Sequence, residues 1–342
     1  MRSHVRTIVV LAVALALVAL FLYNVNLRGV VTAIARARPA WLALSLSTMV
    51  VNLAIRALRW KYLLEPLGPT TFARAFRATA VGFAANAVLP ARAGEVIRPY
   101  FLARQSPQGQ HGRVTATGAF ATIILERLLD TMTVLILLAS FVFVFGKDRA
   151  GVNPTGFALV TWAGASAALV VLFVLAGDPE RLGRTMTRLE QVLPSKLAGM
   201  LARVAEKFAR GLGAIRRPGR LLAALAWSFP LWLSICLGIW STAMAFRFAI
   251  PFTGSFLLLA ILTLGVAVPT PGAIGGFHEA FRIGATLFYG APDAAAVGAA
   301  IVLHAFSIGP ALLLGLFFAG QEGLNFGSMR RLANEAEQGR TA

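Results

Sequence analysis

The sequence predicts an all-α, polytopic membrane helical bundle, and three observations support this fold class. Hydrophobic residues make up 58% of the 342 residues and charged residues only 13%, whereas soluble domains carry about 25% charged residues. Several apolar runs reach the roughly 17–25 residues that a helix needs to cross the hydrocarbon core. Two further apolar segments are broken by Pro and Gly, which membrane proteins tolerate only where protein or a wet cavity surrounds the break. We therefore expect about six full spans and two re-entrant helical hairpins.

The expected full spans are apolar segments flanked by basic residues. They are Thr7–Tyr23, Ala40–Ile55, Val114–Phe145, Phe157–Ala176, Leu221–Phe246 and Ala294–Ala319. The first follows Arg2 and Arg6 as a signal peptide would, but it lacks a clear small-x-small cleavage site and exceeds the roughly 7–15 apolar residues of such a peptide. We interpret it as an uncleaved span. Arg56, Arg59 and Lys61 mark the cytoplasmic end of the second span, where long basic side chains can snorkel to the water.

The net charge of +18 would suit a nucleic-acid partner, but the distribution of the charge argues against one. The basic residues gather in the loops between apolar segments, as the positive-inside rule describes. Membrane lipids with anionic headgroups are the partners that this arrangement favours. Arg2 and Arg6 place the N-terminus in the cytoplasm, and Arg330 and Arg331 place the C-terminus there too. We expect a multi-pass protein of a bacterial cytoplasmic (inner) membrane, with no nucleic-acid partner.

The chain is expected to form a single membrane domain, residues 1–342. Its first half covers residues 1–150, its second half residues 221–320, and residues 321–342 form a cytoplasmic tail. Asp178–Arg220 between the halves is basic, with apolar residues at helical spacing. It is either an amphipathic helix on the inner membrane surface or a solvated linker. Asn24–Pro39 is an expected outer loop, and its Arg28, Arg36 and Arg38 depart from the positive-inside rule.

The first broken segment is Asn86–Arg98, which reads N-A-V-L-P-A-R-A-G-E-V-I-R. Basic residues lie on both sides of it, so we expect a re-entrant hairpin near residues 72–104 that enters and leaves on the cytoplasmic face. Pro90 and Gly94 make the break and suit the start of a half-helix, whose N-terminal dipole favours an anion. The side chain of Asn86 is placed to satisfy backbone groups that the break leaves without partners.

Charged side chains in this segment suit a lipid phosphate. Arg92 and Arg98 are candidate ligands, because the guanidinium group binds phosphate with two parallel hydrogen bonds. Alternatively, both arginines rest on the inner leaflet. Glu95 and Arg98 are three residues apart and can pair if the chain becomes helical after Gly94.

The second broken segment lies near residues 252–289 and contains P-T-P-G-A-I-G-G. Its structural break is formed by Pro269, Pro271, Gly272, Gly275 and Gly276. Glu279 and Arg282 follow at a spacing that allows an ion pair. Counting spans makes this segment a hairpin that enters from the outer face. Pro90-x-x-x-Gly94 aligns with Pro271-x-x-x-Gly275, and such paired breaks in opposite orientation are typical of an inverted repeat around a transport site.

Three charges interrupt the apolar run Val114–Phe145: Glu126, Arg127 and Asp130. Each charge at the bilayer centre costs at least about 2.5–3.5 kcal/mol, so the three need partners or water. Glu126 and Asp130 share one helix face, and Arg127 can pair with Asp130. The group is either a polar lining of a substrate path or a structural salt bridge that locks the bundle.

The remaining candidates are His278, in the second broken segment, and His304, in the last span. They are either members of a proton relay or hydrogen-bonded packing residues. The sequence predicts no metal site and no cofactor. It has a single cysteine, Cys236, and contains no G-x-S-x-G, Walker A or H-E-x-x-H motif. We therefore expect a protein that is not an enzyme.

Three motifs, in this order, carry a family resemblance. Asn86–Arg98 has the pattern N-x-x-L-P-x-R-x-G-E-x-x-R, residues 126–130 have E-R-x-x-D, and Pro269–Glu279 reads P-T-P-G-A-I-G-G-F-H-E. The chain resembles the lysylphosphatidylglycerol synthase transmembrane-domain family, also described as a flippase-like domain. Ala273 stands where that family often has Gly.

The resemblance implies a lipid translocase. In the best-known members the domain moves an aminoacylated phosphatidylglycerol between leaflets, and a fused soluble domain makes that lipid. Stand-alone relatives are associated with other lipids, including hopanoids and polyprenyl-linked sugars. We expect the lipid head to cross a cavity lined by Asn86, Arg92, Glu95, Arg98, Glu126, Arg127, Asp130, Glu279 and Arg282.

Two other functions remain open at this point. One is a membrane-embedded transferase acting on a lipid-linked substrate, with Glu95 or Asp130 as the base. The other is a non-catalytic membrane protein that recruits a lipid-synthesising enzyme through Asp178–Arg220. A homo-oligomer is also compatible with the sequence.

Overall fold

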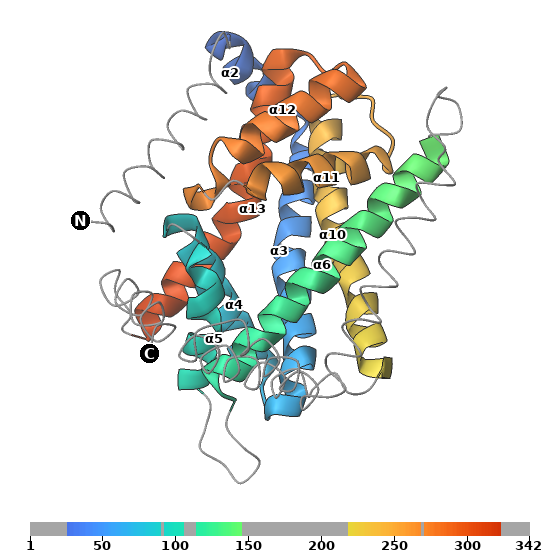
Figure 1. Ribbon diagram of the computed structural model, residues 1–342. Coiled ribbons are helices and arrows are strands. Elements are labelled where there is room, and N and C mark those ends of the chain that lie inside the picture. The colour runs from blue at the N-terminus through green and yellow to red at the C-terminus, as the bar shows by residue number, and fades with distance from the viewer. Residues whose placement is uncertain (1–25, 90–91, 106–113, 146–217, 268–269, 323–342) are drawn as a thin grey trace, which may run out of the picture. The chain divides into compact units, whose positions relative to one another are not determined.

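The computed structural model describes residues 26–89, 92–105, 114–145, 218–267 and 270–322, and every regular element within these ranges is helical. Figure 1 shows these helices in chain order. They are α2 (Leu27–Ala35), α3 (Pro39–Leu64), α4 (Phe72–Val88), α5 (Gly94–Arg104), α6 (Ala116–Phe145), α10 (Pro218–Ala245), α11 (Gly254–Ala267), α12 (Gly276–Tyr289) and α13 (Asp293–Gln321), with the 3₁₀ helices η1 (Glu65–Leu67) and η5 (Pro271–Ala273). The predicted all-α fold class is confirmed.

Three helical segments within the described ranges are long and apolar enough to cross a membrane. They are Pro39–Leu67, Gly219–Ala245 and Asp293–Gln321, and they correspond to the expected second, fifth and sixth spans. The expected third span is the 30-residue helix α6, which carries the three interior charges. Thr7–Tyr23, Phe157–Ala176 and most of Asp178–Arg220 lie outside the described residues.

The described residues divide into two compact units, and each unit combines segments from distant parts of the chain. The first unit contains residues 26–55, 79–89, 92–97 and 230–322, and the second contains residues 56–78, 98–105, 114–145 and 218–229. Helices α3, α4, α5 and α10 contribute residues to both units.

Helices α11 and α12 form an antiparallel hairpin in the first unit. At the tip, Gly265 lies so close to α12 that a Cβ atom on it would overlap the carbonyl oxygen of Gly276 and the side chain of Ala280. At the base, the Tyr289 hydroxyl donates to the Gly254 carbonyl oxygen at 3.0 Å. Small residues allow two helix backbones to approach closely. Residues 254–289 thus contain two closely packed antiparallel helices, and the prediction that they form a re-entrant hairpin in a membrane stays a prediction.

Polar side chains join α3 to α10 in the same unit. The Ser45 hydroxyl donates to the Gly238 carbonyl oxygen at 3.0 Å and lies 2.8 Å from the Thr242 hydroxyl. The Asn52 amide donates to the Leu231 carbonyl oxygen at 2.8 Å. Such hydrogen bonds between apolar helices hold membrane bundles together where the hydrophobic effect provides no driving force between helices.

The close contact at Gly265 leads to a prediction about stability. Gly265→Ala should lower the melting temperature of the detergent-solubilised protein, because overpacking costs about 1–3 kcal/mol. This loss should exceed the roughly 1 kcal/mol that alanine gains in helix propensity. Gly320→Ala is the matched control in α13, since a Cβ there meets no atom within 4 Å. An equal response of the two variants would contradict the close approach of α11 and α12.

Candidate functional site

A cluster of buried charged side chains lies in the second unit. Its members are Arg56 and Arg59 of α3, Arg98 of α5, and Glu126 and Asp130 of α6. None of these side chains is more than 7% exposed. Residues three or four apart on a helix share a face, so α3 and α6 each present two charges in the same direction. We call these five residues the charged cluster.

Arg59 is the centre of the charged cluster because it contacts both carboxylates. Its Nη1 atom lies 2.6 Å from Asp130 Oδ1 and also donates to the Ser228 hydroxyl at 2.7 Å. Its Nη2 atom lies 3.5 Å from Glu126 Oε1. Arg56 Nη1 lies 3.7 Å from the other oxygen of Asp130. A single guanidinium group thus links three helices, α3, α6 and α10.

Arg98 completes the cluster from α5. Its Nη1 atom donates to Glu126 Oε2 at 2.7 Å. Its guanidinium carbon lies 3.7 Å from the ring centroid of Trp60, within the range of a cation–π contact. The Trp60 indole is itself held by a 2.9 Å hydrogen bond to the Thr122 hydroxyl. These contacts fix the plane of the Arg98 guanidinium group.

The charged cluster contains more buried arginines than buried carboxylates, since Arg56, Arg59 and Arg98 face Glu126 and Asp130. The Arg98 Nε and Nη2 atoms and the Arg59 Nε atom are buried and have no hydrogen-bond partner among the described residues. Burying a charge is costly unless it is paired and hydrogen-bonded. The arrangement is therefore chemically suited to an additional anion.

Some predicted site residues lie at the charged cluster with the partners that the sequence predicted, and others have different partners. Arg127 lies 3.6 Å from Asp130, as the spacing predicted, with its side chain 39% exposed. Arg98 pairs with Glu126, 28 residues away in the chain. Glu95 is half-buried at the start of α5.

The two arginines of α3, Arg56 and Arg59, were not among the predicted site residues. The expectation that Arg56 and Arg59 snorkel to the water is wrong, because both side chains are buried against acidic partners on α6. Their three-residue spacing within an apolar segment is the signal that could have identified them. Spacings of three and of four residues each place two side chains on one helix face. Arg56 and Arg59 can therefore face Glu126 and Asp130, which need positive partners.

The tips of the two broken segments meet in the first unit, and we call this contact the hairpin junction. Arg92 Nη2 donates to the carbonyl oxygen of Val266, near the end of α11, at 2.9 Å. A Cβ atom on Gly272 would lie 3.3 Å from the Ala87 carbonyl oxygen. Within the first break, the Asn86 side chain accepts a hydrogen bond from the Gly94 amide at 2.8 Å. Asn86 thus satisfies one backbone amide of the break, while its predicted contact with a substrate stays a prediction.

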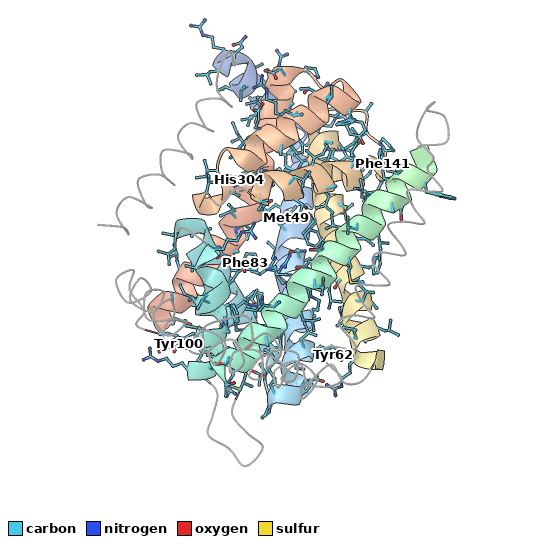
Figure 2. All side chains as sticks on the ribbon, viewed as in Figure 1. Met49, Tyr62, Phe83, Tyr100, Phe141 and His304 are labelled. Atoms are coloured by element: carbon cyan, nitrogen blue, oxygen red, sulfur yellow. The ribbon has the colours of Figure 1, made fainter. Side chains whose placement is uncertain are left out.

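Two histidines hold the second break. His304, labelled in Figure 2, reaches from α13 to the Gly272 carbonyl oxygen with its Nε2 atom at 2.7 Å. A carbonyl oxygen only accepts, so His304 Nε2 carries the proton. His278 Nδ1 accepts from the Gly275 amide at 3.3 Å, and the two rings lie 4.4 Å apart. Both histidines are therefore hydrogen-bonded to the backbone of the second break, and a proton relay stays a prediction.

The breaks also contain left-handed backbone. Gly272 and Gly275 have φ angles of 61° and 88°, which glycine adopts without steric cost. Arg92 and Ala273 have φ angles of 53° and 56° although they carry a Cβ atom, a conformation that is uncommon and costly for such residues. Further along, Pro271 begins η5 and Gly276 begins α12, whereas Pro90 and Pro269 lie outside the described residues.

A third group consists of Glu279, Arg282 and Asp293 in the first unit. Arg282 lies 3.6 Å from Glu279, as the spacing predicted, and its Nε atom donates to Asp293 of α13 at 2.6 Å. This ion pair ties α12 to the start of α13. Except for Glu95, the residues expected to line one cavity each belong to one of three contact groups: the charged cluster with Arg127, the hairpin junction, and the group of Glu279, Arg282 and Asp293.

Comparison with known proteins agrees with the resemblance found in the sequence. The family model described as the lysylphosphatidylglycerol synthase TM region matches residues 7–315. A search among curated proteins finds no significant match to the chain. With the membrane-spanning helices described above, the match identifies a multi-pass membrane protein of a family associated with lipid handling.

The charged cluster generates a stability prediction. Glu126→Gln should destabilise the protein by about 3–5 kcal/mol, because it leaves Arg59 and Arg98 buried with one fewer anionic partner. Arg127→Gln is the control in the adjacent position, and it should cost less than about 1 kcal/mol because its side chain is partly exposed. Thermal unfolding in detergent measures both. Similar melting temperatures for the two variants would contradict the central role of Glu126.

The hairpin junction generates a second prediction. His304→Ala removes the donor to the Gly272 carbonyl oxygen, so backbone amides of residues 270–276 should exchange with solvent deuterium up to about tenfold faster, as expected for one hydrogen bond. His304→Gln keeps an amide donor and should stay close to the unmodified protein. Hydrogen-exchange mass spectrometry provides the comparison. Unchanged exchange in His304→Ala would show that this hydrogen bond does not hold the break.

Proposed function

Because the chain belongs to the family of the lysylphosphatidylglycerol synthase transmembrane region, we propose that it is a lipid translocase. It moves an amphipathic lipid or a polyprenyl-linked lipid from one membrane leaflet to the other. The observation that carries the proposal is the charged cluster, since charges buried in a helical membrane protein are expensive and mark substrate or ion paths.

The composition of the charged cluster supports a lipid whose head contains phosphate. Translocation requires the polar head to leave water and cross the apolar core, which is costly without compensating charges. Arg59 and Arg98 offer buried N–H donors that have no hydrogen-bond partner among the described residues. Guanidinium groups bind phosphate oxygens with charge-assisted hydrogen bonds. An anionic or zwitterionic phospholipid head would supply the missing acceptors.

The hairpin junction supports a moving part. The two broken segments meet through the Arg92–Val266 hydrogen bond, and His304 holds the second break. In transporters, broken helices of opposite orientation form the site, and one repeat moves against the other. In our proposal the hairpins are re-entrant, and a change in their mutual contact accompanies the passage of the lipid head.

The contacts of Asp130 favour translocation over transferase chemistry. A general base needs a carboxylate free to accept a proton from the substrate. Asp130 receives Arg59 at 2.6 Å and Arg56 at 3.7 Å. These arginines lie against both carboxylate oxygens, where a substrate proton would have to arrive. We therefore propose that the charged cluster binds the lipid head and does not act in bond making.

Lipid exchange in proteoliposomes tests the proposal. Fluorescent phosphatidylglycerol in the inner leaflet is protected from dithionite, so its movement to the outer leaflet appears as a loss of fluorescence. The unmodified protein should accelerate this loss over protein-free vesicles. Arg98→Gln should slow it about ten- to a hundredfold, the effect of losing a charge-assisted hydrogen bond of roughly 1.5–3 kcal/mol. Arg104→Gln, an exposed arginine of the same helix, should leave the rate unchanged.

Two results would overturn the proposal. One is that vesicles with the unmodified protein exchange lipid no faster than empty vesicles for any of phosphatidylglycerol, phosphatidylethanolamine and a polyprenyl phosphate. The other is an Arg98→Gln rate equal to that of the unmodified protein. Gel filtration and a melting curve for each variant ensure that a lost activity is not caused by unfolding.

A further inference from the structure

Three membrane-spanning helices of the first unit have an end close to α2. Helix α3 begins at Pro39, α10 ends at Ala245 and α13 begins at Asp293. The Arg38 amide donates to the Ala245 carbonyl oxygen at 3.0 Å, which brings the start of α3 beside the end of α10. Figure 1 shows α2 beside the start of α13. Helices that cross a membrane end at the boundaries of the hydrocarbon core, so we expect one boundary at this end of the first unit.

Aromatic residues at this end mark the same boundary. The rings of Trp41 and Trp240 pack edge to face at 5.2 Å, and Phe252 packs on Trp240 at 6.0 Å. The Trp240 indole donates to the Ile250 carbonyl oxygen at 3.2 Å. Tryptophan is enriched at the level of the lipid headgroups, where its ring is apolar and its N–H is polar.

Helix α2 has a buried face and an exposed apolar face. Val30 is buried, and Gly298 of α13 allows α2 to pack closely against it. Leu27 and Val31 are 61% and 66% exposed. They are four residues apart and so lie on one face of the helix. A short helix with exposed apolar side chains beside the ends of apolar helices is suited to the membrane interface, where such side chains can meet acyl chains.

Exposed arginines surround this apolar face. They are Arg28, Arg36, Arg38 and Arg247. Residues 26–64 and 221–278 contain no Asp or Glu, and Asp293, the acidic residue at the start of α13, is occupied by Arg282 at 2.6 Å. Within the described residues of the first unit, the sequence therefore offers few carboxylates to balance these four arginines. Arg28, Arg36 and Arg38 lie in the segment expected to be an outer loop, where the positive-inside rule predicts few basic residues.

We propose that Leu27, Arg28, Val31, Arg36, Arg38 and Arg247 form a binding surface for anionic phospholipids of the leaflet in which α2 lies. Leu27 and Val31 contact the acyl chains just below the headgroups. The arginines bind the phosphate groups, which guanidinium recognises with charge-assisted hydrogen bonds. The surface selects anionic over zwitterionic lipids, because only the former bring net negative charge to an unbalanced basic group. This inference does not depend on lipid translocation.

A fluorescent reporter on α2 tests the proposal. Val31→Cys is labelled with a small fluorophore, since the native Cys236 is buried and Val31 is exposed. The labelled protein is placed in nanodiscs that contain equal mole fractions of bromine-labelled phosphatidylglycerol or bromine-labelled phosphatidylcholine. Bromine quenches only nearby fluorophores. Phosphatidylglycerol should quench at least about twofold more than phosphatidylcholine, and raised ionic strength should reduce this preference.

Variants of the arginines test whether these residues cause the preference for phosphatidylglycerol. The triple variant Arg28→Gln/Arg36→Gln/Arg38→Gln should quench equally with both lipids. The corresponding triple lysine variant keeps the charge and should retain the preference. Arg77→Gln/Arg104→Gln removes exposed arginines of the second unit and should leave the preference unchanged. Equal quenching by the two lipids in the labelled protein itself, or a preference that survives in the glutamine variant, would overturn the proposal. The first of these comparisons needs no arginine substitution, so it is valid even where a variant fails to fold.

Discussion

The buried guanidinium of Arg59 is the interaction on which the second unit depends. It contacts Asp130 and Glu126 of α6 and the Ser228 hydroxyl of α10, and it is itself fully buried on α3. Separating any of these helices would leave charges in an apolar medium without partners, at a cost far above that of a surface ion pair. The helices must therefore pack with this register for the chain to fold in a membrane.

The charged cluster that links these helices contains more arginines than carboxylates. Arg98 shares Glu126 with Arg59 and rests on the Trp60 ring. A purely structural network in an apolar medium would be expected to balance its charges and satisfy its donors. The excess of arginine is therefore the feature that links the packing of this unit to the proposed handling of a phosphate-bearing lipid head.

In the first unit, the main requirement is to provide hydrogen-bond partners for the backbone groups at the two helix breaks. Breaking α4 from α5 and α11 from α12 leaves carbonyl and amide groups without helical partners. Asn86 satisfies the Gly94 amide, Arg92 the Val266 carbonyl oxygen and His304 the Gly272 carbonyl oxygen. Because the last two hydrogen bonds come from other helices, each break is stable only while those helices stay in place, and this makes the junction a natural point of rearrangement.

The sequence by itself determined the apolar helices, the two breaks and the local pairs. Hydrophobic length, Pro and Gly positions and three-residue spacing are local properties, so they indicated where the helices break and the pairs Arg127–Asp130 and Glu279–Arg282. Tertiary structure alone decided which charges meet. Arg59 binds Asp130 across 71 residues, and Arg98 binds Glu126 although Glu95 is nearer in the chain. The physical reason is that buried ions pair across helix faces, and the packing of the helices, which no spacing encodes, brings those faces together.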